Sequence, residues 1–381
     1  MATSITRIRG DLTLGEKLVQ IPYGLLFTVA VTASIGFAML YSAAGGSWEP
    51  WASRQVVRFG VGMALLLCVA VIDIRFWFRI AYVFYGVALV LLVAVEFKGR
   101  IGLGAQRWLD IGFIQLQPSE LMKIALVLSL ARYFHGLTYE QVGNPLRLVF
   151  PTALVMAPAA LVFKQPDLGS ALLIVLVSGI LFFLAGVRLW KFAIIIGAGV
   201  AAIPVAWNYL RDYQKRRIYT FLDPENDPLG AGYHTIQSKI ALGSGGVWGK
   251  GYLSGTQSHL QFLPERQTDF IFTMLSEEFG MVGGLTLLGL YSVILLYGLW
   301  MALKVKTQFG RLTAMGIMAS FYIYGFINIA MVMGVLPVVG EPLPLISYGG
   351  TAMMSLLIGF GLLINVYVHR EVLFGRSGAS D

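Results

Sequence analysis

The sequence predicts an all-α polytopic membrane protein with ten transmembrane helices. Three observations support this fold class: 57% of the 381 residues are hydrophobic, the mean hydropathy is +0.74, and the charged residues, 13% of the chain, gather between apolar runs. A helix needs roughly 20 mostly apolar residues to cross a bilayer, and runs of this length recur along the whole chain. The short connections between them favour helices over the strands of a barrel.

The predicted spans lie at Tyr23–Ser42, Val56–Ile72, Phe76–Val95, Leu116–Tyr133, Leu146–Phe163, Leu168–Ala185, Trp190–Leu210, Val282–Leu303, Leu312–Gly334 and Thr351–Val368. The first lacks a small-residue cleavage site, so we expect it to be retained and not removed as a signal peptide. No repeat or Ser/Gly-rich linker divides the chain. Residues 1–381 are therefore predicted to form a single membrane domain, in which residues 211–281 are a large extracytoplasmic loop between the seventh and eighth helices.

The distribution of Lys and Arg predicts the orientation. An even number of spans places both termini on one side, and that side carries more than twice as many Lys and Arg residues as the short loops of the other side. By the positive-inside rule both termini are cytoplasmic, and residues 211–269 face outward. The net charge of +8 is spread through membrane-flanking loops without a nucleic-acid-binding motif, so membrane lipids, and no nucleic acid, are the expected partners. Cys68, the single cysteine, is expected to be a small buried residue without a disulfide.

Asp269 is the first candidate for a catalytic residue. It ends a polar stretch, residues 211–270, where the apolar run Phe270–Phe272 begins. A carboxylate there is ionised at neutral pH and, once oriented, can accept a proton. The structural alternative is a helix N-cap, for which Asp is favoured. The neighbouring Glu265, Arg266 and a glycine-rich segment favour the catalytic interpretation.

Two charged residues inside the fourth predicted span, Glu120 and Lys123, are three positions apart and share a helical face. An unpaired charge at the centre of a transmembrane helix costs roughly 2.5–3.5 kcal/mol, so the two are expected to pair and to face protein or a wet cavity. The pair either locks helices together or lines a functional cavity.

Four further motifs contain helix breakers or membrane-boundary residues. Residues 105–110 combine a cation, an indole and an acid, which suits either an interfacial anchor or a binding site. Residues 165–170 are typical of an ordinary Pro/Gly turn. Residues 340–350 are typical of a re-entrant element buried in protein. The glycine run 243–251 lacks the residues of a phosphate loop, so its glycines serve either a flexible turn or a close backbone approach.

Six motifs, taken together, resemble the SEDS (shape, elongation, division and sporulation) family over nearly the whole chain. They are residues 105–109, 117–120, 165–169, 227–234, 263–272 and 344–350. Residues 237–241, 243–246 and 255–258 are similar to the elongation member of the family more than to the division member. One departure is Gln267, where many members have His.

This resemblance implies a peptidoglycan glycosyltransferase with ten transmembrane helices in the bacterial inner membrane. It implies that the protein polymerises lipid II, a polyprenyl-pyrophosphate disaccharide pentapeptide, at the periplasmic face during cell elongation. Asp269 occupies the position of the family's catalytic aspartate. The implied partners are a class B penicillin-binding protein, which is a transpeptidase, and the rest of the elongation machinery.

Under this hypothesis Asp269 orients or deprotonates the 4-hydroxyl of the acceptor sugar, which attacks the anomeric carbon of the donor with inversion. The leaving pyrophosphate develops charge that cations would stabilise. A divalent cation, Mg²⁺ or Mn²⁺, is a candidate cofactor, although the four histidines show no metal-ligand spacing and the metal ligands are unknown. The candidate substrate-binding residues are Arg107, Trp108, Glu120, Lys123, Arg211, Lys215, Arg216, Arg217, Lys239, Glu265 and Arg266.

Two other functions stay open. A transporter or lipid II flippase would show matching halves with broken helices at corresponding positions, but the breaker-rich run occurs once, near the C-terminus. A non-catalytic scaffold that recruits the transpeptidase would tolerate Asp269→Asn. Polymerisation of lipid II by wild-type and variant protein separates these functions from catalysis.

Overall fold

The computed structural model describes residues 12–102, 105–110, 112, 115–209, 231–256 and 265–373, together with positions 215, 219, 221, 223 and 375. Each predicted apolar segment coincides with a helix. In chain order these are α2 (Tyr23–Ala43), α3 (Ala52–Val71), α4 (Ile74–Lys98), α5 (Pro118–His135), α7 (Pro145–Lys164), α8 (Leu168–Leu184), α9 (Leu189–Tyr209), α13 (Ile271–Lys304), α14 (Gln308–Val332) and α15 (Gly350–Val368). Three shorter helices are α1 (Leu14–Val19), α6 (Tyr139–Val142) and α11 (Ala231–Ser244).

Within these described ranges, seven helices are long and apolar enough to cross a membrane: α2, α3, α4, α7, α13, α14 and α15. Two others, α8 and the Leu189–Pro204 part of α9, are apolar but shorter. The 18-residue helix α5 carries the charges of Glu120, Lys123 and Arg132. The chain is therefore an integral membrane protein built mainly from helices.

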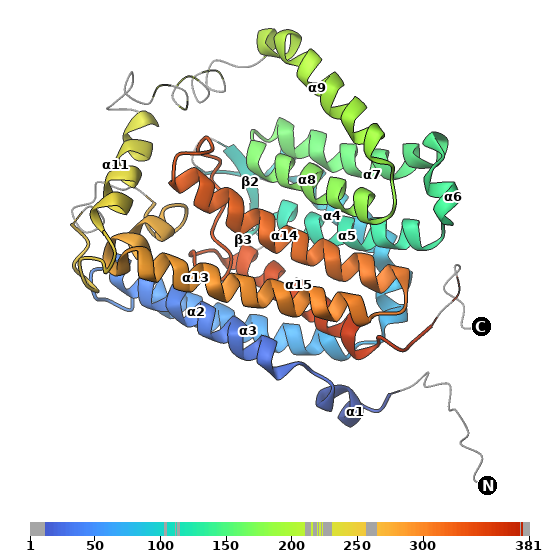
Figure 1. The fold of residues 1–381 in the computed structure, drawn as a ribbon, viewed down its shortest axis with the longest axis horizontal. Coiled ribbons are helices and arrows are strands. Elements are labelled where there is room, and N and C mark those ends of the chain that lie inside the picture. The colour runs from blue at the N-terminus through green and yellow to red at the C-terminus, as the bar shows by residue number, and fades with distance from the viewer. Residues whose placement is uncertain are drawn as a thin grey trace.

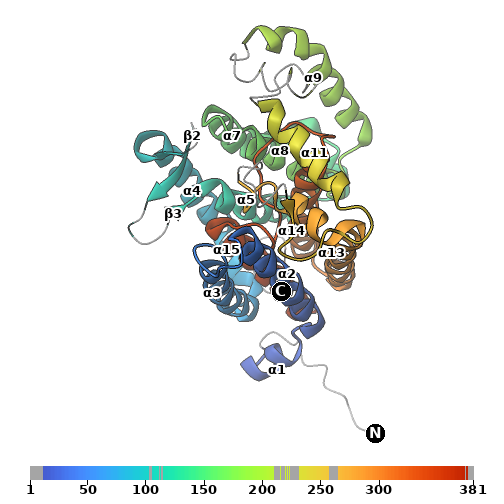
Figure 2. The ribbon, with the colours of Figure 1, turned by 90° about the vertical axis from the view of Figure 1, so that its left-hand side faces the viewer.

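The long helices form a bundle in which segments far apart in the sequence lie side by side (Figure 1). Helix α3 packs along α15, α4 along α5, and α13 against both α2 and α14. Seen end-on, α5, α14 and α15 occupy the middle of the bundle (Figure 2). Helix α11 and strand β2 lie toward one end of the bundle, and α1 and α6 lie toward the other (Figure 1).

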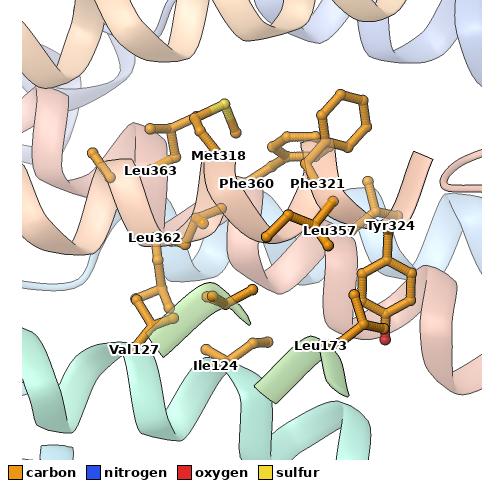
Figure 3. Packing of buried hydrophobic residues seen from close by; sticks show 14 of the residues in the cluster. Ile124, Val127, Leu173, Met318, Phe321, Tyr324, Leu357, Phe360, Leu362 and Leu363 are labelled. Atoms are coloured by element: carbon orange, nitrogen blue, oxygen red, sulfur yellow. The ribbon is translucent and has the colours of Figure 1, made fainter. Parts of the chain in front are cut away.

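The core lies where α5, α8, α14 and α15 meet, and its side chains come from all four helices (Figure 3). Val127, Leu173, Phe321, Leu357 and Phe360 are each at most 2% exposed. Lipid tails are as apolar as these side chains, so in a bilayer such helices associate through van der Waals packing and not through transfer from water.

Helix α9 stands apart from the bundle (Figure 1). Its consecutive residues Ile194, Ile195 and Ile196 are 60%, 69% and 64% exposed. Consecutive side chains of a helix point about 100° apart, so α9 is apolar and exposed on several sides. Such a helix suits a lipid environment.

The structure corrects the all-α prediction in one region. Residues 100–116, expected to be a loop, contain the short strands β1 (Arg100–Gly102), β2 (Ala105–Asp110) and β3 (Gln115–Leu116), which form an antiparallel sheet in the order β1-β2-β3. Strands this short show too little alternation to be recognised in a sequence, yet their pairing satisfies backbone groups. Cys68 is also exposed, where we expected a buried residue, because it lies on a face of α3 that the bundle leaves uncovered.

Candidate active site

Asp269 lies in the turn that leads into α13. The helix begins at Ile271, and its N-cap residue is Phe270, whose side chain makes no capping hydrogen bond. Asp269 is half-buried and precedes the cap position. Helix capping therefore does not explain this aspartate.

The backbone that carries Asp269 is fixed by groups from the other end of the chain. The three carbonyl oxygens of residues 267–269 accept, in order, from the Tyr348 N–H at 2.8 Å, the Ser347 Oγ at 2.6 Å and the Asn328 Nδ2 at 3.0 Å. Asn328 is fully buried in α14. These three consecutive bonds hold the turn in one position relative to α14 and α15.

Residues 333–349, the connection between α14 and α15, form the wall beside Asp269. The connection is irregular, and it buries Leu343, Leu345 and Ile346 to 2% exposure or less. The predicted buried element with helix breakers is thus confirmed. Gly340 has φ +84°, and a Cβ at this position would lie 3.5 Å from Oδ2 of Asp269. The carboxylate therefore rests directly beside Gly340.

Glu120 and Lys123 form the expected pair. Lys123 Nζ lies 2.7 Å from Glu120 Oε1, and both residues are 6% exposed. The Tyr324 hydroxyl, on α14, donates to the same Oε1 at 2.9 Å, and Lys123 Nζ lies 4.0 Å from the centre of the Tyr324 ring. The pair therefore links α5 to α14.

The same pair also lines a mainly apolar cavity of about 70 Å³ between α5, α14, α15 and the 333–349 connection. Ile124 and Tyr324, both labelled in Figure 3, also line this cavity. The pair therefore links two helices and lines a cavity, and a functional role of this cavity stays a prediction.

A second buried polar cluster lies around Asp167, which precedes α8. Its carboxylate accepts from the Ser170 N–H at 3.4 Å and lies 3.7 Å from Arg107 Nε. Arg107 also donates to the Pro166 carbonyl at 2.7 Å. Ser170 in turn donates through Oγ to the buried carboxylate of Glu341 at 2.9 Å.

Sequence reasoning treated residues 165–170 as an ordinary turn and overlooked Asp167, Glu341 and Asn328 as parts of one site. Asp167 does serve the turn, because it is the N-cap residue of α8. A usable signal was present in the sequence: an acid set in an apolar, breaker-rich run at a membrane boundary is uncommon unless it faces other protein groups.

The other predicted site residues lie on separate segments of the chain. Trp108 in β2 and Glu265, Arg266 and Lys215 are half-buried, and burial lowers the pKa of Arg266. Lys239 on α11 is exposed, and a Cβ at Gly334 would lie 2.1 Å from its Cε. The remaining predicted residues, Arg211, Arg216 and Arg217, lie outside the described residues.

No group of three or more His, Cys, Asp or Glu side chains that could hold a metal occurs in the described residues. In this part of the chain the candidate site therefore supplies two carboxylate–cation pairs, Asp167 with Arg107 and Glu120 with Lys123, and not a closed set of metal ligands. Asp269, a group able to accept a proton, lies beside Gly340, the residue before the buried Glu341.

The glycine run 243–251 packs by its backbone against a kink in α13. The kink is at Gly280, with φ +65° and ψ −159°. The N–H groups of Lys250 and Gly251 donate to the carbonyls of Glu277 and Glu278, each at 3.0 Å. Of the two interpretations, close backbone approach is confirmed, and the partner is a helix of the same chain.

Gly249→Ala is expected to lower the free energy of unfolding by about 2–4 kcal/mol, because it combines left-handed strain with an overpacked contact. Gly249 has φ +80°, and its added Cβ would lie 2.1 Å from the Glu278 carbonyl oxygen. Thermal unfolding of the detergent-solubilised protein measures the effect. Gly243→Ala is the matched control, because nothing lies within 4 Å of its added Cβ; equal melting temperatures for the two variants would contradict the prediction.

Two curated proteins resemble this chain over most of its length. Peptidoglycan glycosyltransferase MrdB of Escherichia coli (strain K12) is 44% identical over 369 residues, which cover 95% of this chain and 97% of that protein. Peptidoglycan glycosyltransferase RodA of Treponema pallidum (strain Nichols) is 34% identical, with 90% of this chain and 96% of that protein covered.

Two solved structures have a similar fold. A chain of a peptidoglycan synthase complex that coordinates polymerization and crosslinking superposes with a TM-score of 0.79 at 32% identity, covering 92% of this chain and 98% of that chain. The rod shape determining protein RodA of Thermus thermophilus superposes with a TM-score of 0.70 at 29% identity, covering 92% and 97%. Residues 23–372 also match the family model for FtsW, RodA and SpoVE, described as cell cycle protein. The chain therefore belongs to the FtsW, RodA and SpoVE family of cell cycle proteins.

Proposed function

We propose that Asp269 is the catalytic carboxylate with which this peptidoglycan glycosyltransferase polymerises lipid II into β-1,4-linked glycan strands during cell elongation. The observation that carries this assignment is the position of the carboxylate beside Gly340, on a turn held by α14 and the connection that follows it. A reacting group fixed in this way needs little reorganisation when the substrate binds. The names of the relatives supply the class of reaction.

In the proposed step the oxygen of the acceptor 4-hydroxyl bonds to the anomeric carbon of the donor sugar. The bond from that carbon to the pyrophosphate oxygen breaks, and its electron pair leaves with the pyrophosphate. Asp269 accepts the hydroxyl proton. A positioned general base of this kind contributes typically about 10²–10⁴-fold in rate.

The leaving pyrophosphate requires positive charge. Arg107 and Lys123 are engaged by Asp167 and Glu120, whereas Lys239 is exposed on α11 and is the better candidate for direct contact. The cations at positions 211 and 215–217, with Arg266, complete the proposed set.

A divalent cation, Mg²⁺ or Mn²⁺, would take pyrophosphate oxygens of the substrate as ligands. Mg²⁺ is commonly bound by one or two carboxylates together with substrate phosphates. The described residues hold no group of three His, Cys, Asp or Glu side chains that could bind a metal, so the substrate's oxygens and water would supply most of the ion's ligands. The ion would neutralise charge on the leaving group.

The proposed topology has ten spans, α2 to α5, α7 to α9 and α13 to α15, in one domain of residues 1–381. Both termini are cytoplasmic, and Asp269 lies at the periplasmic face of the bacterial inner membrane. The large extracytoplasmic loop, residues 211–281, would include α11 and the part of α13 that precedes its kink at Gly280. The charge bias between the two sides of the membrane supports this orientation.

A class B penicillin-binding protein, a transpeptidase of the elongation machinery, is the proposed partner. The support is that a chain of similar fold comes from a complex that coordinates polymerization with crosslinking. Crosslinking of glycan strands is the chemistry that such a transpeptidase would supply.

The test uses purified protein reconstituted with lipid II, alone and with the transpeptidase. We expect glycan strands from the wild-type protein on gels. Transfer of labelled lipid II across the bilayer without strand formation would support the flippase instead. If the protein neither forms strands nor transfers lipid II but still binds the transpeptidase, the result would support a non-catalytic scaffold.

A further inference from the structure

Glu341 is a buried carboxylate that the proposed reaction does not use. It lies in the 333–349 connection, next to Gly340, and is 3% exposed. Its Oε1 accepts from the Ser170 hydroxyl, in the first turn of α8, at 2.9 Å. A Cβ at Gly169 would lie 2.8 Å from the same oxygen, so glycine leaves room for this contact. Glu341 thus ties the connection to the start of α8.

The backbone of Glu341 is coupled to the backbone of Asp269 through Asn328. Asn328 Nδ2 donates to the Glu341 carbonyl at 2.7 Å and to the Asp269 carbonyl at 3.0 Å. Gly340, the residue before Glu341, flanks the Asp269 carboxylate. A shift of Glu341 would therefore disturb two of the contacts that place Asp269.

The charges around Glu341 leave it without a cation of its own. Lys123 is 2.7 Å from Glu120, and Arg107 is 3.7 Å from Asp167. In the part of the chain that the structure describes, no Lys or Arg forms an ion pair with Glu341. A buried carboxyl group in this position is more stable as the neutral acid than as an unpaired anion.

The pKa of the Glu341 carboxyl group agrees with its burial and with the absence of a paired cation among the described residues. Burial raises the pKa of Glu341 from 4.5 to about 8, with Lys123 acting in the opposite direction and the acids Asp167 and Glu120 raising it further. The Ser170 hydrogen bond lowers it. The titratable groups that act on the side chain are Glu120 and Lys123 on α5 and Asp167 ahead of α8. Of the groups next to these, Tyr324 on α14 donates to Glu120, and Asp269 lies beside Gly340, the residue before Glu341.

We propose that Glu341 is a positioning residue that works as a neutral carboxylic acid. In this form it holds Gly340 and the contacts of Asn328 in the geometry that orients Asp269 toward the 4-hydroxyl of the acceptor sugar. The inference rests on the proposed catalytic role of Asp269. Ionised Glu341 would add a negative charge beside Asp167 and Glu120 and would be repelled by both. Polymerisation therefore falls as the pH rises through about 8.

Two substitutions separate the neutral acid from an ionised one. Glu341→Gln keeps the shape and the acceptor of the protonated acid, so it retains the wild-type rate at pH 7 and loses the alkaline decline. Glu341→Ala removes the tie to Ser170, and displacement of a catalytic group by such a loss lowers kcat by about tenfold or more. The measurement is the rate of lipid II polymerisation against pH. Glu140→Gln, at an exposed position on α6, is the matched control and keeps the wild-type profile.

The pH dependence of the melting temperature tests the same group without catalysis. The native state keeps a proton that the unfolded chain releases, so this group's contribution lowers stability as the pH rises from about 4.5 to about 8 and then levels off. Glu341→Gln removes that fall. This comparison needs only folded wild-type and Gln protein, so it stands even where Glu341→Ala does not fold.

The proposal is overturned if folded Glu341→Gln is as inactive as Glu341→Ala, or if it keeps the wild-type alkaline decline. Failure of the proposed function gives a different result. In that case Asp269→Asn polymerises lipid II as well as wild type does, while the melting temperatures of the Glu341 variants still report on its protonation.

Discussion

Lys123→Met is expected to lower the free energy of unfolding by about 3–5 kcal/mol, because it leaves a buried carboxylate without its cation. Glu120 and Lys123 are both 6% exposed and lie 2.7 Å apart. Tyr324 donates to the same Glu120 oxygen, but a single neutral hydrogen bond does not replace the lost charge. Thermal or denaturant unfolding of the purified protein in detergent measures the loss.

Two controls show whether the buried charge is the cause. The double variant Glu120→Gln, Lys123→Met removes both charges and is expected to be more stable than Lys123→Met alone. Lys306→Met breaks an ion pair with Glu371 whose side chains are 57% and 52% exposed, so the loss there is at most about 1 kcal/mol. A loss for Lys123→Met no larger than that for Lys306→Met would show that the pair is not buried as described.

Asp269→Asn is expected to lower the rate of lipid II polymerisation by about 10²–10⁴-fold, the contribution typical of a positioned general base. The amide keeps the size of the side chain but does not take up the acceptor proton. Because the carbonyl of residue 269 and its bond to Asn328 are unchanged, the fold and the binding of lipid II should be nearly unaffected. Initial rates at saturating lipid II, with melting temperatures alongside, measure the two effects separately.

Asp223→Asn is the matched control for this substitution. Asp223 is an exposed aspartate within the proposed extracytoplasmic loop, and its replacement is expected to leave the rate unchanged. An equal loss in both variants would mean that the fall at Asp269 reflects general damage to the loop and not loss of a proton acceptor.

Most of the helical fold could be predicted from the sequence, because each helix of about 20 apolar residues satisfies its own backbone and needs no distant partner to be recognised. The strands β1–β3 were missed because each strand can be recognised only together with a partner strand. Leu109 pairs with Leu116 and Trp108 with Arg100, and such pairs between short segments leave little pattern in the sequence.

The candidate site likewise contains contacts that the sequence predicts and contacts that it does not. Glu120 and Lys123 could be paired from the sequence because they are one helical turn apart. The contacts of Arg107 with Asp167 and of Ser170 with Glu341 join residues 60 and 171 positions apart. Such contacts arise only when the bundle assembles, so a single sequence does not reveal them.

The catalytic role of Asp269 is tested most directly by comparing glycan-strand formation by purified wild-type protein and Asp269→Asn at equal occupancy by lipid II. We predict that both proteins bind lipid II and that only the wild type forms strands at a measurable rate. Strand formation by the folded variant at the wild-type rate would contradict this role.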